Sequence, residues 1–200
     1  MIDAFIVASW TAVLWILAMN CARRRDLLFP AAATRWAVAA AFGTACLAAM
    51  PYAELYVCIG LSAIAVAAVV DAQSGYIFDP LILAGVIGVV ATATLEQNAV
   101  ESIYGAIVAG GTVLCIWAAS LGRGLGLGDV KLAVVLGAVF GPLGGIAAIG
   151  LAFMAGAAVA TCRIIVGKAN FGTSIRFGPY LLAGSVCLLA YNRMSDGVLR

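Results

Sequence analysis

The fold is decided by the stretch Gly122-Arg123-Gly124-Leu125-Gly126-Leu127-Gly128-Asp129-Val130-Lys131, after which 31 residues carry no charged side chain. Glycine at every second position removes side chains, so the backbone there is free to bend or to be approached closely. Asp129 then places a carboxylate at the mouth of an apolar segment. An ionisable group in that position indicates a function and a partner elsewhere in the chain.

The composition predicts a polytopic membrane domain. Of the 200 residues, 65% are hydrophobic and 10% are charged, and the mean hydropathy is +1.13, which is unlike a soluble domain. Apolar segments fall at about 4–20, 33–50, 55–70, 80–95, 102–120, 130–141, 145–166 and 177–191. We therefore expect one all-α integral membrane domain over 1–200, a bundle of about 6–8 transmembrane or partly embedded helices.

The basic residues predict how this bundle is oriented. If the connection at 21–35 is cytoplasmic and the segments alternate, only Arg193 and Arg200 of the 11 Lys and Arg residues fall outside. That distribution is a strong positive-inside bias. The acids of the inner side are then Asp26, Asp71, Asp79 and Asp129.

The segment after Asp129 is short for a membrane span. Between Val130 and the break at Gly141-Pro142, about eleven residues reach only about 16 Å as helix, against a hydrocarbon core of about 30 Å. Two interpretations remain open. Either the helix starts below the membrane surface, which would place Asp129 within the inner leaflet, or it does not cross fully.

The absence of histidine narrows the possible chemistry. It excludes Ser-His and Cys-His nucleophiles and the H-E-x-x-H zinc site. The six cysteines are scattered singly, which favours packing over a metal site or a disulfide, and the glycine run matches neither nucleotide-binding pattern. A serine–lysine pair with Lys131 or Lys168 remains possible, although Lys131 is better explained as an anchor at the inner surface.

Two carboxylates remain as the best candidates for chemistry. Asp71 ends the third apolar segment and Asp129 opens the sixth, both on the inner side. Two such acids can hold a water, one ionised as base and one protonated as acid, because adjacent like charges resist double ionisation. The alternative for Asp129 is helix capping, the role that we expect for Asp79 before Pro80. Asp71 lies at the wrong end of its helix for a cap.

Three motifs resemble those of the type IV prepilin peptidases, a family of membrane aspartic proteases. Gly126–Leu132 looks like the G-x-G-D-V-K-L motif, Asp71–Asp79 resembles the first aspartate motif, and Ile175–Tyr180 is similar to the late hydrophobic-Pro-Phe-Gly-Pro-aromatic element. They follow the family's order over about 71–180, within a motif-bearing core at about 55–191. Phe78 and Arg176 stand where the family usually has proline, a difference that bears on substrate positioning rather than on chemistry.

The resemblance implies that Asp71 and Asp129 are the catalytic pair of an endopeptidase. It also implies pilin-like precursors as substrates, with a short basic leader cut off after a glycine, at the cytoplasmic face of a bacterial inner membrane. We expect the leader to lie along the backbone of the glycine run, and assign substrate binding to Gly124, Gly126, Gly128 and Lys131. Beyond these precursors and the lipid bilayer we expect no nucleic acid, metal or cofactor.

The first connection, at roughly 21–32, bears on a second activity. Long family members carry a cytoplasmic domain there, with paired C-x-x-C motifs, and also methylate the new N-terminus. Here that connection is too short, so we expect a peptidase without methyl transfer or S-adenosylmethionine, resembling the peptidases of tight-adherence (Flp) pilus systems.

Two other functions remain open. One is a small transporter or pilus-assembly protein that uses Asp71 and Asp129 as a proton or cation site. A transporter would be expected to place its acids near the midplane and to show two related halves. The other is a degenerate homologue that acts as a scaffold, which the intact Asp71 and Asp129 argue against.

Overall fold

The protein is a bundle of α-helices. The computed structural model describes residues 2–27, 31–48, 54–122, 125–167 and 176–198, and every regular element within these ranges is helical. The helices are α1 (Ile2–Arg23), α2 (Ala31–Ala48), α3 (Leu55–Ser74), α4 (Asp79–Leu95), α5 (Ala99–Ala119), α6 (Leu127–Ile165) and α7 (Gly178–Val198). Among them α1, α3, α5 and α6 are long and apolar enough to cross a membrane. The predicted all-α membrane bundle is confirmed.

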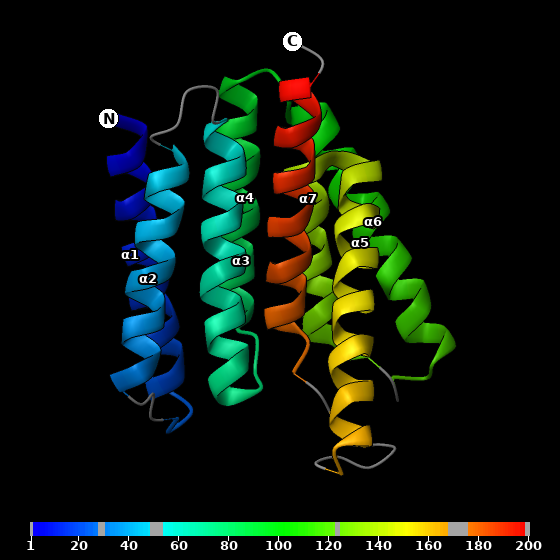
Figure 1. Ribbon diagram of the computed structural model, residues 1–200. Helices are drawn as coiled ribbons and strands as arrows, with labels where there is room; N and C mark the ends of the chain where they lie inside the picture. Colours follow the sequence, from blue (N-terminus) through cyan, green and yellow to red (C-terminus); the bar gives the residue numbers. More distant parts are fainter. Residues whose placement is uncertain (1, 28–30, 49–53, 123–124, 168–175, 199–200) are drawn as a thin grey trace.

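The helices stand side by side and alternate in direction (Figure 1). We call the lower end of the bundle in Figure 1 the motif end; α1, α3 and α5 finish there, and α2, α4, α6 and α7 begin there. Arg23, Arg24 and Arg25 lie where α1 finishes, and Arg176 lies just before α7. The alternation agrees with the segments that hydropathy predicts, while the side of the membrane that the charges predict for each end stays a prediction.

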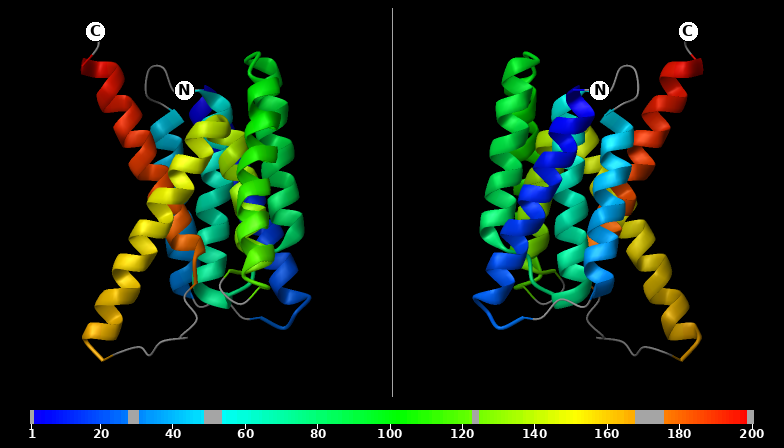
Figure 2. Two further views of the ribbon diagram at one scale, coloured as in Figure 1. Left: turned by 90° about the vertical axis from the view of Figure 1, so that its right-hand side faces the viewer. Right: turned by 90° about the vertical axis from the view of Figure 1, so that its left-hand side faces the viewer.

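Helix α6 consists of two limbs. Gly141 interrupts it with φ 69° and ψ −176°, a backbone conformation in the left-handed half of φ space that glycine adopts at low cost. Pro142 follows, and Figures 1 and 2 show the chain turning back there toward the motif end. The limbs correspond to the predicted segments 130–141 and 145–166. The first limb, 127–140, is about 20 Å long, which is shorter than the roughly 30 Å hydrocarbon core.

Helix α3 forms the centre of the bundle. It contacts α1, α2, α4, α6 and α7, and its residues are buried almost without interruption from Cys58 to Asp71. A helix that is buried on all sides is held in place by packing rather than by one apolar face. Asp71, in the last turns of α3, is therefore carried on the most firmly placed helix of the bundle.

Glycines bring α5 and the first limb of α6 into backbone contact. A Cβ on Gly105 would lie 2.1 Å from the carbonyl oxygen of Gly137, and a Cβ on Gly137 would lie 2.1 Å from that of Gly105. A Cβ on Gly145, in the second limb, would lie 2.8 Å from the Cα of Gly137. Small residues allow such close helix packing in membranes, and here they fix the limb that carries Asp129.

We expect Gly105→Ala to destabilise the bundle and Gly111→Ala, on the same helix, not to. A Cβ at Gly111 meets no atom within 4 Å, and alanine is preferred to glycine in a helix by about 1 kcal/mol. The Cβ at position 105 forces two backbones apart, which should lower the unfolding midpoint by roughly 5–10 °C. Thermal unfolding of both purified variants in detergent measures this, and equal midpoints would contradict it.

Candidate active site

Asp71 is a buried carboxylate at the motif end of α3, with only 6% of the residue exposed. Its Oδ2 accepts a hydrogen bond of 2.9 Å from the backbone N–H of Gly178, where α7 begins. The first N–H groups of a helix have no partner within that helix, so the carboxylate satisfies one of them. This contact explains how an acid is accommodated at the C-terminal end of α3, where the helix dipole disfavours it.

Arg176 ties the same segment to α3. Its Nη1 donates a hydrogen bond to the backbone carbonyl of Ala72, one of the last carbonyls of the helix, which lack helical donors. Its charge also interacts favourably with the carboxylate of Asp71. Arg176 is one of the two residues that stand where the family usually has proline, and the structure gives it a contact with the carbonyl of Ala72.

Asp129 lies in the first turn of α6 and is half-buried. Its Oδ2 accepts a hydrogen bond of 3.1 Å from the backbone N–H of Gly126, the N-cap residue. This is the reciprocal half of a capping box, made from the third position of the helix. The N-cap position considered for Asp129 is taken by Gly126. Asp129 makes the reciprocal bond instead, which occupies only Oδ2 and leaves Oδ1 outside that bond.

The structure brings the two acids to the same end of the bundle. Helices α3 and α6 are in contact, with Asp71 where one finishes and Asp129 where the other begins. The carboxylates lie near enough for their charges to repel each other. Residues 58 apart in sequence are thus brought to one end of the bundle, Asp71 buried and Asp129 half-buried.

Lys131 forms an ion pair with Asp79. The prediction that Asp79 caps α4 is wrong, because Phe78 is the N-cap residue and Asp79 is already helical. No side-chain cap bond is made there. Both side chains remain accessible, 41% exposed for Lys131 and 74% for Asp79, so the pair contributes at most about 1 kcal/mol to stability. Its placement is more informative, because it joins the start of α4 to the helix of Asp129.

The predicted substrate-binding glycines have different surroundings. Gly126 is exposed and extended, with φ −84° and ψ 150°, but its N–H donates to the Asp129 carboxylate and its carbonyl accepts from the N–H of Asp129. Gly128 is packed instead, since a Cβ there would lie 3.0 Å from Cδ1 of Ile77 in the connection after α3. Gly124 lies outside the described residues. Substrate binding by these glycines and by Lys131 stays a prediction.

The residues matched by a family comparison include both acids. The model of the type IV leader peptidase family matches residues 58–161, just over half of the 200 residues. The chain belongs to the type IV leader peptidase family. Neither a curated protein nor a solved structure matches it. Membership implies a peptidase of leader sequences and, in general, pilin-like precursors as its substrates.

In this leader peptidase the matched range contains both acids and the ion pair of Lys131 but stops before α7. Sequence reasoning named Asp71 and Asp129 and missed the contacts that Arg176 and Gly178 make with α3. The late motif at 175–180 was the available signal for them. It indicated the family but assigned these two residues no partner.

We expect the ion pair of Lys131 and Asp79 to position Asp129. Lys131→Glu replaces attraction to Asp79 by repulsion at the start of α6, and we expect it to lower kcat for leader removal about tenfold. Adding Asp79→Lys restores an opposite pair and should recover most of that loss. Initial rates of the single and double variants with one purified precursor measure the coupling. A double variant no faster than Lys131→Glu would contradict the positioning role.

Proposed function

We propose that the protein is an aspartic endopeptidase that removes the short basic leader of type IV pilin-like precursors, with Asp71 and Asp129 activating water. The observation that carries the proposal is the placement of two acids, from α3 and α6, at one end of the bundle. It is supported by family membership and by the absence of histidine, which removes the common nucleophile–base pairs.

The mechanism follows from the surroundings of each acid. Burial disfavours the charged form of Asp71, and the N–H of Gly178 and the charge of Arg176 counteract this effect. We assign the ionised form to Asp71 and, because adjacent like charges resist double ionisation, the protonated form to Asp129. Asp71 takes a proton from the water while the water oxygen attacks the scissile carbonyl carbon. Asp129 donates a hydrogen bond to the carbonyl oxygen. The tetrahedral intermediate collapses with cleavage of the C–N bond, and the leaving nitrogen receives a proton from the acid pair.

The charge distribution supports a cytoplasmic active site in a bacterial inner membrane. The acids share the motif end with Arg23, Arg24 and Arg25 at the end of α1, and basic connections remain on the cytoplasmic side. A basic leader would meet the exposed residue Gly126 at this end. The transporter alternative is less well supported, because the acids lie at one end of the bundle rather than near its middle.

We also propose that the protein performs no methyl transfer and uses no S-adenosylmethionine. Helix α1 ends at Arg23 and α2 begins at Ala31, which leaves no room between them for the cytoplasmic domain of long family members. This short form is the basis for placing it with the peptidases of tight-adherence (Flp) pili.

Co-expression with candidate pilin precursors tests the proposed activity. The wild-type protein should shorten a precursor by its leader, seen as a gel shift, and the mass of the product should show an unmethylated N-terminus. Precursors that keep their leaders in every pairing would refute the peptidase proposal. A product heavier by one methyl group would refute only the proposed lack of methyl transfer.

A further inference from the structure

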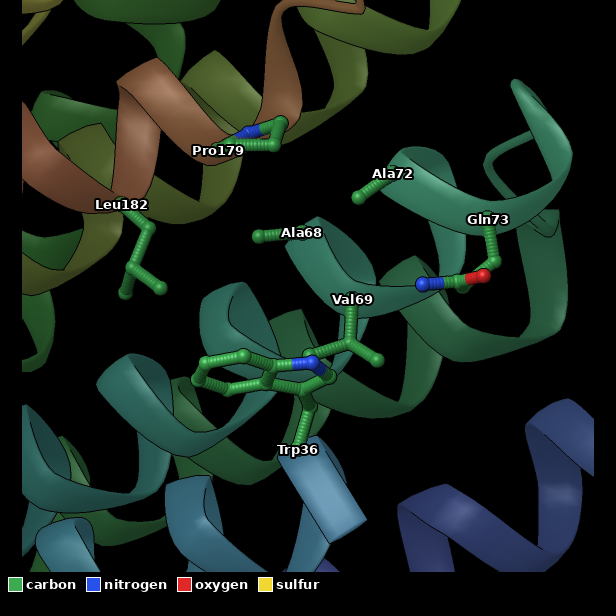
Figure 3. A pocket seen from close by; sticks show the side chains of 7 residues that line it. All are labelled: Trp36, Ala68, Val69, Ala72, Gln73, Pro179 and Leu182. Atoms are coloured by element: carbon green, nitrogen blue, oxygen red, sulfur yellow. The ribbon is translucent and has the colours of Figure 1, made fainter. Parts of the chain in front are cut away.

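A pocket of about 190 Å³ lies at the motif end of the bundle, lined by neighbours of Asp71 in the sequence but not by Asp71 itself. Its walls come from α2, α3 and α7, and Figure 3 shows the side chains that surround it. They belong to Trp36, Ala68, Val69, Ala72, Gln73, Pro179 and Leu182. The pocket is thus formed where the second turn of α2, the last turns of α3 and the first turns of α7 approach each other.

The lining favours an apolar occupant. None of the lining residues is charged, and Gln73 supplies the one side-chain amide. The indole of Trp36 forms one wall in Figure 3, yet 64% of this residue is exposed. Pockets of this kind bind apolar groups and use a few polar atoms to orient them. A lysine or arginine side chain would find no partner for its charge here.

The pocket is built on the same chain segments that hold Asp71. Ala72 follows Asp71, and Pro179 follows Gly178, whose N–H bonds the carboxylate. Arg176 binds the carbonyl of Ala72. A group seated between α3 and α7 in this pocket is therefore positioned by the junction that also positions the carboxylate of Asp71.

We propose that this pocket binds a large apolar side chain from the first residues of the substrate helix, on the carboxyl side of the cleaved bond. The inference rests on the proposed function, in which a basic leader precedes the bond and an apolar helix follows it. The uncharged lining suits the apolar part and rejects the leader. The bound side chain acts as an anchor that selects which peptide bond reaches Asp71 and Asp129.

Enzyme variants that change the size of the pocket test the proposal. Ala68→Leu fills it, and Trp36→Ala removes one wall. Because Trp36 is largely exposed, its truncation should leave the fold intact even if Ala68→Leu does not fold. Val38→Ala is the matched control, since Val38 is on the same helix, is 63% exposed and does not line the pocket.

The substrates are one precursor that the wild-type enzyme cleaves and four variants of it. Each variant has alanine at one of the first four positions after the cleaved bond. We expect alanine at one of these positions to lower kcat/KM of the wild-type enzyme about 10- to 100-fold, the usual range for part of a side chain in an apolar pocket. The Ala68→Leu enzyme should show a similar loss of kcat/KM with the parent precursor. Its kcat/KM should fall little further with the precursor whose alanine slows the wild-type enzyme. Trp36→Ala should reduce the ratio of kcat/KM between the parent precursor and the affected alanine variant. Val38→Ala should show the same ratio as the wild type.

Two results would overturn the proposal while leaving the peptidase assignment intact. One is a wild-type enzyme that cleaves all five precursors equally well. The other is a loss in Ala68→Leu and Trp36→Ala that is the same for every precursor, as expected if lipid or a second copy of the chain fills the pocket. A wild-type enzyme that cleaves none of them refutes the proposed function itself.

Discussion

Asp71→Asn and Asp129→Asn are each expected to abolish leader removal. Asparagine keeps the shape of the side chain and can still accept a hydrogen bond, from Gly178 in one case and from Gly126 in the other. It cannot take a proton from water or return one to the leaving nitrogen. Loss of a general acid or base costs about 10²- to 10⁴-fold in rate, which is enough to leave the precursor uncut in a co-expression experiment.

Asp26→Asn is the matched control for this prediction. It makes the same chemical change in an exposed acid at the motif end, in the connection after α1, and it should process the precursor like the wild type. The amounts of all three variants in the membrane fraction show whether they insert equally. Normal processing by either Asp71→Asn or Asp129→Asn would refute the catalytic pair.

Gly178→Val is expected to lower kcat about 100-fold, because a misplacement of about 1 Å at a catalytic group costs that much. A Cβ at position 178 would lie 2.8 Å from Oδ2, 2.9 Å from Cβ and 3.2 Å from Cγ of Asp71. These atoms belong to a short side chain on the buried helix α3, so they have little freedom to move away. Either α7 shifts and its N–H leaves the carboxylate, or Asp71 turns away from Asp129.

Gly150→Val provides the control, since a Cβ at Gly150 meets no atom within 4 Å. Single-turnover rates with one precursor, together with unfolding midpoints, separate misplacement of Asp71 from loss of the fold. A folded Gly178→Val variant as active as Gly150→Val would show that contact with α7 does not position Asp71.

The helices of this protein were predictable because their signals are local. Membrane helices are specified by runs of apolar residues, and the predicted segments match α1 to α7, including the two limbs of α6. The break in α6 was also predicted, since Gly141-Pro142 is a local signal. Asp71 and Asp129 could be named as a pair because the chain lacks histidine and few acids lie at the basic end.

The partners of Asp71 and Asp79 were not predictable, because they depend on helix packing. The bond from Gly178 to Asp71 joins residues 107 apart, and the pair of Lys131 with Asp79 joins residues 52 apart. The capping prediction for Asp79 was wrong because α4 begins one residue earlier than expected, with Phe78 as the N-cap residue.

By itself, the sequence determined the helical membrane bundle and the succession of its segments, and it singled out Asp71 and Asp129 as candidates. Apolar runs, flanking charges and the absence of histidine can all be read from residue type and order alone. Only the tertiary structure decided that α7 holds the carboxylate of Asp71, that Gly128 is a packing position, and that a pocket opens between α2, α3 and α7. These features are set by which helix faces meet, and that depends on the packing of the whole bundle.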